Sequence, residues 1–131
     1  MKFLLLVASF GLLSGCSVGL SPDYNNYNQQ LRNQMQEMIN TLFGGHRSEF
    51  MQNYVDPSYI TKMGGVDAAT RLFTDQRATA LQAALRVAKQ VQPTYDEAAR
   101  QMTYYTDGMA QPIVFKQKSG KWYLQDDWFR L

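Results

Sequence analysis

The stretch PIVFKQKSGKWYLQD, residues 112–126, decides the fold class of this chain. Apolar and polar side chains alternate along residues 112–118 and again along residues 121–126. Alternation with a period of two is typical of a β-strand that buries one of its faces. Ser119-Gly120 joins the two runs, and a two-residue connection that contains glycine is typical of a tight β-hairpin turn. The sequence therefore predicts an antiparallel hairpin near the end of the chain.

The hairpin is expected to pair with at least one strand that precedes it. Residues 97–106 show the same alternation, with Met102 and Tyr104 on one face, and the turn signal Asp107-Gly108 follows them. Residues 90–95 either add a further strand or form a connection, and the sequence leaves both interpretations open. We therefore expect a short antiparallel sheet.

Ahead of the sheet, apolar residues recur at the three- and four-residue spacing of amphipathic helices. A capping residue followed by proline, as in Ser21-Pro22 and Asp56-Pro57, favours the start of a helix, whereas Gly44-Gly45 and Gly64-Gly65 favour helix ends. The expected helices cover residues 22–43, 47–55, 57–62 and 67–91, and the last is the longest. The sequence predicts an α+β fold in which N-terminal helices pack on a short, curved antiparallel sheet, with no internal repeat and no second domain.

This order of elements resembles the nuclear-transport-factor-2-like superfamily, which has a cone-shaped α+β fold. The similarity lies in Gly120-Lys121-Trp122-Tyr123 of the hairpin and in Tyr54-Val55-Asp56-Pro57 after the first long helix, and it covers residues 31–128. The resemblance implies a helix-covered cone, in a reduced form if only three strands are present. Enzymes of this superfamily use Asp or Asp/His groups inside the cone. No residue of this chain matches those positions by motif, so none is carried over.

At the other end of the chain, Leu13-Ser14-Gly15-Cys16 closes an apolar run that begins at Phe3 and follows Lys2. A basic residue, a short apolar stretch and small residues before a cleavage point are features of a secretory signal peptide, and the stretch is too short to span a bilayer as a helix. The pattern resembles a bacterial lipobox. That resemblance implies a diacylglycerol thioether on Cys16, cleavage just before it, and acylation of the new amine, for example by palmitate.

The lipobox sets the expected organisation of the chain. Residues 1–15 are the lipoprotein signal peptide, residues 16–23 a lipidated tether, and residues 24–131 a single domain. Serine follows Cys16, where lipoproteins retained at the inner membrane of enteric-type bacteria commonly have aspartate. The resemblance therefore implies an outer-membrane lipoprotein whose domain faces the periplasm, held stably because two or three acyl chains enter the bilayer.

Composition argues against several function classes. The chain has 13 Lys and Arg against 11 Asp and Glu, and losing Lys2 with the signal peptide brings this balance nearer to zero, so no nucleic-acid partner is expected. Cys16 is the only cysteine. Once it is lipidated, no thiol remains for a disulfide, a metal site or nucleophilic catalysis. The glycine pairs and the acidic residues lack the spacing of phosphate-binding or calcium-binding loops, so we expect neither a cofactor nor a metal.

Few residues are candidates for chemistry. His46 is the sole histidine and adjoins Gly44-Gly45. It is expected to be a solvated loop residue, because a general base needs a partner group and a pocket. Asp126-Asp127 are expected at a solvated strand end, where neighbours point to opposite faces. Aromatic residues are the remaining enrichment, and those outside the core are expected to form a recognition surface or a pocket. The candidates for that surface or pocket are Tyr95, Tyr104, Tyr105, Phe115, Trp122 and Trp128.

These observations favour a membrane-anchored, non-catalytic recognition or adaptor lipoprotein of the bacterial cell envelope. Its expected partners are the lipid bilayer, through acylated Cys16, and another envelope protein, with a homodimer through the sheet as a further expectation. One alternative is a domain that binds a small apolar ligand inside the cone, where Tyr104 and Phe115 would leave a cavity. The other is an enzyme of the isomerase or dehydratase type, which would need a buried carboxylate or His46 in a pocket.

Overall fold

The computed structural model describes residues 22–129 of the 131-residue chain. The expected signal peptide, the lipidation site Cys16 and most of the expected tether lie outside the described residues. By its internal contacts the chain divides into two compact units, residues 1–30 and residues 31–131. The described part of the first unit is the start of one helix, and that helix continues into the second unit, which contains every other described element.

Within residues 22–129, five α-helices precede a four-stranded sheet, which confirms the expected α+β class. The helices are α1 (Pro22–Phe43), α2 (Arg47–Tyr54), α3 (Pro57–Met63), α4 (Val66–Leu72) and α5 (Asp75–Ala88). The strands are β1 (Thr94–Asp96), β2 (Gln101–Tyr104), β3 (Ile113–Lys118) and β4 (Lys121–Leu124), followed by a short 3₁₀ helix, η2 (Asp126–Trp128).

The prediction of one long helix over residues 67–91 is wrong, because the chain breaks between α4 and α5. The Thr74 hydroxyl accepts a hydrogen bond from the backbone N–H of Arg77 at 3.3 Å, so Thr74 caps the N-terminus of α5. Phe73 leaves the helical conformation (φ −90°, ψ 83°) and its side chain is buried. The Phe73 ring at the break packs in the core, stacked on Phe50 with centroids 5.7 Å apart.

The predicted hairpin is confirmed. The strands follow the order β1-β2-β3-β4, and every neighbouring pair is antiparallel. β3 and β4 meet at the turn Ser119-Gly120, whose residues have φ values of 52° and 79°. Positive φ at both turn positions suits the right-handed twist of a two-residue hairpin.

The strand predicted over residues 97–106 is present only as β2. The chain turns just before it, where Arg100 adopts a positive φ of 54° and its N–H donates to the carbonyl of Glu97. The Asp96 carboxylate supports the turn by accepting a hydrogen bond from the backbone N–H of Ala99 at 3.1 Å. β1 pairs with β2, so part of residues 90–95 forms the fourth strand that the sequence left open.

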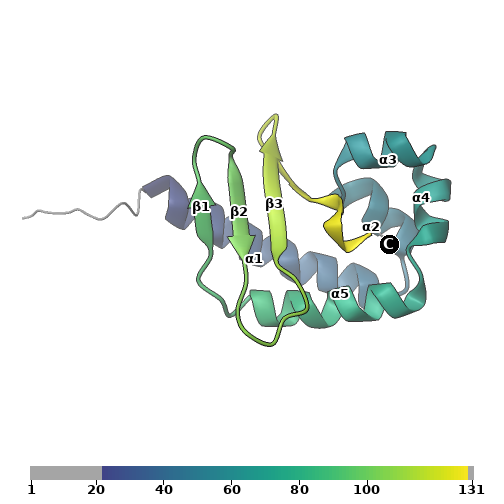
Figure 1. The fold of residues 1–131 in the computed structure, drawn as a ribbon, viewed down its shortest axis with the longest axis horizontal. Helices are drawn as coiled ribbons and strands as arrows, with labels where there is room; N and C mark the ends of the chain where they lie inside the picture. Colours follow the sequence, from purple (N-terminus) through teal and green to yellow (C-terminus); the bar gives the residue numbers. More distant parts are fainter. Residues whose placement is uncertain (1–21, 130–131) are drawn as a thin grey trace, which may run out of the picture. The chain divides into compact units, whose positions relative to one another are not determined.

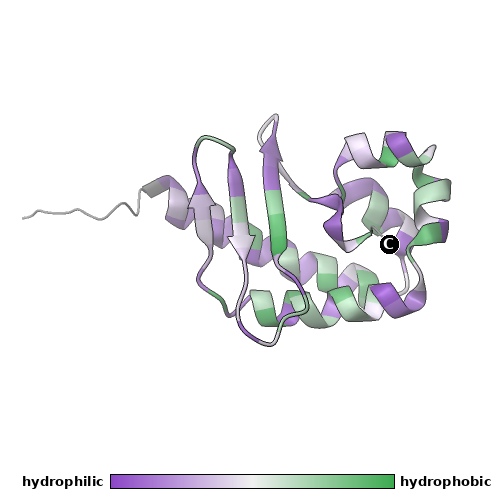
Figure 2. Ribbon diagram, in the orientation of Figure 1, coloured by the Kyte–Doolittle hydropathy of each residue, from purple (hydrophilic) through white to green (hydrophobic). Residues whose placement is uncertain are grey.

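The core lies between the sheet and the helices. α5 and the part of α1 from Leu31 onward run side by side (Figure 1) and are joined to each other and to the sheet. The Arg32 guanidinium donates to the carbonyl of Val91 at 3.4 Å, and the Gln34 amide donates to the carbonyl of Trp122 at 3.0 Å. Apolar residues are prominent on β3 and along α5 (Figure 2), and the strand faces alternate between buried and half-buried side chains.

The helices α2, α3 and α4 lie beside the C-terminal segment (Figure 1) and are joined to it by aromatic packing. The ring of Phe129 stacks on Tyr59, with centroids 5.6 Å apart, and meets Phe73 edge-on at 5.0 Å. Arg77 of α5 donates a hydrogen bond to the carbonyl of Phe129 at 2.8 Å. The described end of the chain is therefore part of the core.

We expect Phe129→Ala to lower the free energy of unfolding by about 3–5 kcal/mol, the usual cost of removing a buried phenyl ring. Phe43→Ala is the matched control, because Phe43 is 79 % exposed and its loss should change stability by about 0.5 kcal/mol or less. Urea unfolding followed by circular dichroism measures both. Equal stability of the two variants would contradict the placement of Phe129 in the core.

Candidate functional site

The structure places most of the predicted aromatic recognition surface inside the core. Tyr104, Phe115, Trp122 and Trp128 are all buried. The rings of Tyr104 and Phe115 meet edge-on, with centroids 6.1 Å apart, so this pair fills space instead of lining a cavity. Tyr104, Phe115 and Trp122 are therefore core residues, whereas the buried Trp128 also borders a small pocket.

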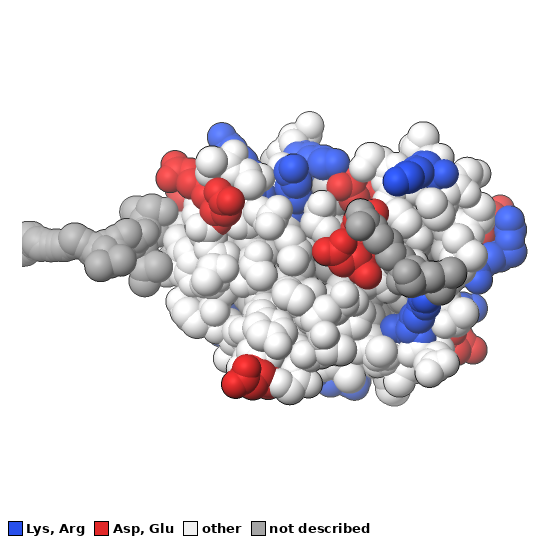
Figure 3. Space-filling model, in the orientation of Figure 1, with Lys and Arg blue, Asp and Glu red and all other residues white. Residues whose placement is uncertain are grey.

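The other two aromatic candidates lie nearer to the solvent. Tyr95 on β1 is half-buried, whereas Tyr105, just after β2, is 48 % exposed. Figure 3 shows an uncharged area over the lower part of the sheet and the connection between β2 and β3, with charged side chains mostly towards the margins. The six candidates therefore do not come together as one surface.

The pocket that Trp128 borders is small and apolar and lies between α5 and the connection from β2 to β3. The pocket has a volume of about 170 Å³ and is lined mainly by small residues of α5 and of the β2–β3 connection. The indole N–H of Trp128 donates to the carbonyl of Pro112 at 2.9 Å, which holds the ring against that connection. Neither Tyr104 nor Phe115 lines this pocket.

The remaining candidates for chemistry do not assemble into a reactive centre. His46 is exposed just before α2, as expected for a loop histidine. Asp126 and Asp127 begin η2 and do not lie at a strand end, which corrects the sequence prediction. Among the described residues, no group of three His, Cys, Asp or Glu side chains is placed to hold a metal ion.

Among residues 22–129, one carboxylate is buried, that of Asp56 at the N-cap of α3. Asp56 is only 6 % exposed. Oδ1 accepts hydrogen bonds from the backbone N–H of Ser58 at 2.9 Å, from the Ser58 hydroxyl at 2.8 Å, and from Lys118 Nζ at 2.8 Å. Oδ2 accepts from Lys118 Nζ at 2.9 Å and from the Gln125 amide at 3.4 Å. The capping role was predicted, but the partner at the far end of β3 was not.

Burial alone would raise the pKa of Asp56, but the hydrogen bonds from Lys118 and Ser58 outweigh it and hold the pKa below its ordinary value. A group with a lowered pKa stays ionised at neutral pH and is a poor general acid or base there. The hydrogen-bond partners of the Asp56 carboxylate belong to α3 (Ser58), to β3 (Lys118) and to the segment after β4 (Gln125). The Asp56–Lys118 pair therefore joins the helices to the sheet and is not a catalytic centre.

We expect Asp56→Asn, which keeps the capping oxygen, to cost about 1–2 kcal/mol at pH 7. This is the lower part of the range for hydrogen bonds to charged groups, because Lys118 is partly exposed. The pKa of Asp56 in the folded state lies below the unfolded value of about 3.9. The ionised carboxylate therefore makes its full contribution to the free energy of unfolding above about pH 3.9, and this contribution is lost as the pH falls through the folded-state pKa.

Urea unfolding at several pH values measures this. The difference in the free energy of unfolding between wild type and Asp56→Asn should decrease below about pH 4. Asp107→Asn, at an exposed turn residue, is the control. Its free energy of unfolding should differ from that of wild type by the same amount at each pH. Parallel pH curves for wild type and Asp56→Asn would contradict the role of the ion pair.

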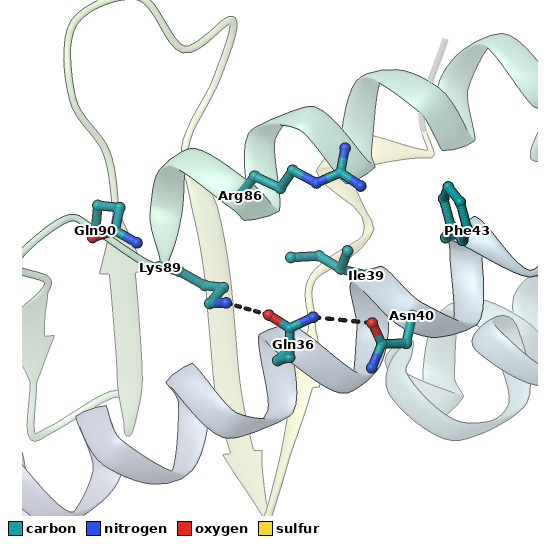
Figure 4. A pocket seen from close by; sticks show the side chains of 7 residues that line it. All are labelled: Gln36, Ile39, Asn40, Phe43, Arg86, Lys89 and Gln90. Carbon is teal, nitrogen blue, oxygen red and sulfur yellow. Dashed lines mark hydrogen bonds between the residues drawn. The ribbon is translucent and has the colours of Figure 1, made fainter.

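The second feature is an open groove of about 430 Å³ between α1 and α5 (Figure 4). Its floor is Ile39, which is 4 % exposed. Six further residues line it, none of them acidic: Gln36, Asn40 and Phe43 from α1, Arg86 from α5, and Lys89 and Gln90 directly after α5.

A chain of hydrogen bonds crosses one end of this groove. Lys89 donates to the side-chain oxygen of Gln36, and the Gln36 amide donates to the side-chain oxygen of Asn40 at 2.9 Å. Figure 4 shows this chain running from α5 to α1, below Arg86 and Ile39. The Lys89 ammonium therefore already has one partner inside the groove.

The other end of the groove is open. Arg86 extends along α5 towards the end of α1, where Phe43 points up from the opposite wall (Figure 4). Among residues 22–129, no hydrogen bond or ion pair engages the Arg86 side chain. The sequence pattern singled out neither Arg86 nor Phe43, which is the last residue of the expected helix over residues 22–43. The feature of the sequence that could have indicated this groove is Phe43. It lies immediately before Gly44-Gly45 and outside the apolar face of the helix over residues 22–43.

No protein-family model matches this chain, and neither a curated protein nor a solved structure matches it significantly. Within the described part of the chain, no helix combines the length and the apolar character needed to cross a membrane.

Proposed function

We propose that this chain is a lipid-anchored, non-catalytic recognition domain of the bacterial cell envelope, and that it binds another envelope protein through the groove between α1 and α5. Acylated Cys16 anchors it to the outer membrane, with the domain in the periplasm. The observation that carries the recognition role is the open end of the groove, which is lined by the exposed ring of Phe43 and by Arg86, a cation without a partner among the described residues. Exposed aromatic and arginine side chains are enriched where proteins bind one another.

The reduced nuclear-transport-factor-2-like fold belongs to the same proposal. It is supported by the order of helices before an antiparallel sheet and by the closing hairpin. The filled contact between Tyr104 and Phe115 favours recognition on the outside of the domain over a ligand inside the cone. The engagement of the buried Asp56 carboxylate by Lys118 and Ser58 likewise favours a binding role over catalysis.

The anchor is tested in cells with Cys16→Ser. We expect the wild-type chain to incorporate labelled palmitate and to sediment with membranes, and the variant to lose both properties because the thioether needs the thiol. Ser17→Ala is the control and should behave as wild type. Membrane association of Cys16→Ser at the wild-type level would contradict lipid anchoring at this residue.

The recognition role is tested by photocrosslinking the natural lipidated form in intact cells. A benzophenone amino acid at position 43 should capture one envelope protein, and Arg86→Glu in the same chain should reduce the yield at least tenfold, about 1.4 kcal/mol, as expected for losing a charge-assisted contact. The same crosslinker at position 72 is the control, because Leu72 is also exposed (49 %) but lies on α4. Identical products from positions 43 and 72, unaffected by Arg86→Glu, would contradict the proposal.

A further inference from the structure

We infer that the α1–α5 groove takes an acidic segment of a partner protein, one that presents a carboxylate beside a large apolar side chain. This inference rests on the proposed recognition function and names the chemistry of the partner. It comes from the charge, the apolar surface and the hydrogen-bonding groups of the seven lining residues.

The charged side chains that line the groove are all positive. Arg86 and Lys89 are its two charged lining residues, and none of the seven is acidic. Lys89 is held by Gln36, which leaves the Arg86 guanidinium as the cation with its donors open. A guanidinium matches a carboxylate geometrically, with two parallel N–H donors for two oxygens. The partner group expected at Arg86 is therefore a carboxylate.

The apolar surface lies next to that cation. Phe43 is 79 % exposed and lines the groove from the end of α1, together with Arg86 of α5 and the buried Ile39. Figure 4 shows the Arg86 side chain above Ile39 and the Phe43 ring farther along, at the end of α1. A partner side chain that fills this end would bury the phenyl ring while its neighbouring carboxylate meets Arg86, so both groups have to lie close together on one segment.

The uncharged polar groups favour a peptide over a lipid surface. The side-chain amides of Gln36, Asn40 and Gln90 line the groove. Gln36 and Asn40 share one hydrogen bond, and the donors and acceptors that remain on the three amides suit a peptide backbone. Anionic membranes, by contrast, are recognised by clusters of about four to eight basic residues, whereas this groove has two. From Gln36 to Phe43 the wall is about 10 Å long, or two helical turns, which suits a short segment.

The experiment measures the binding of fluorescein-labelled peptides to the full lipidated chain in detergent micelles by fluorescence anisotropy. The first peptide has about 12 residues, more than the two helical turns of the groove, with Glu and Leu at helical spacing. The second is identical except that every Glu is Lys. Vesicles with and without anionic lipid, free of peptide, form the third arm and are assayed by co-flotation of the Cys16→Ser chain, which lacks the proposed acyl anchor.

We expect the acidic peptide to bind at least tenfold more tightly than the basic one. Added salt should lower the affinity of the acidic peptide, because the contact is between charged groups. Arg86→Glu should reverse this preference, and Phe43→Ala should weaken the acidic peptide without reversing it. Arg71→Glu, an exposed arginine on α4, is the matched control and should leave the preference unchanged. Circular dichroism of each variant verifies that it is folded.

Three results would overturn the inference: equal affinity for both peptides, an acidic preference that Arg86→Glu leaves unchanged, or Arg86-dependent binding to anionic vesicles without binding of the acidic peptide. The proposed function fails separately. If position 43 captures an envelope protein in cells but the groove shows no acidic preference, recognition stands and only this assignment of the partner's chemistry falls.

Discussion

The buried carboxylate of Asp56 is the constraint on which the arrangement of the helices and the sheet depends. It caps α3 through Ser58, holds Lys118 at the end of β3, and its backbone N–H donates to the carbonyl of Leu124 at the end of β4. A buried charge is costly unless it is paired and hydrogen-bonded, so the helical segment and the hairpin are stable only in the relative position that satisfies all of these groups. Once that position is set, Phe129 lies where it can pack between Tyr59 and Phe73.

This way of closing the fold decides where the proposed recognition of a partner can occur. The aromatic residues of the strands are used to fill the space between the sheet and the helices, and Trp128 completes that packing from the C-terminal side. Little of the aromatic enrichment remains for a surface. The groove between α1 and α5 instead combines residues that pack poorly in any core, two long cations and three amides, with one ring, that of Phe43, left outside.

The sequence carried local information well and tertiary information poorly. The Ser119-Gly120 turn and the Asp56-Pro57 helix start follow from chemistry within a few residues, and both are present. The break at Thr74 was missed because α4 and α5 keep the same helical spacing on either side of it. The partnership of Asp56 with Lys118 was missed because 62 positions separate the two residues. The groove escaped prediction for the same reason, since periodicity indicates which face of each helix is buried but not which neighbouring helix lies beside it.

The proposed anchor and the proposed groove are physically complementary. A contact area about two helical turns long, with one open guanidinium and one exposed ring, is small beside the interfaces of stable complexes, and binding must also offset the loss of free motion of both partners. Anchoring to the membrane system that holds the partner reduces part of that cost, because a second binding event between tethered molecules proceeds at a raised effective concentration. With the proposed lipid anchor, a groove that binds its partner with low affinity is therefore sufficient. Its modest size also makes the contact readily reversible, which suits an adaptor better than a permanent subunit.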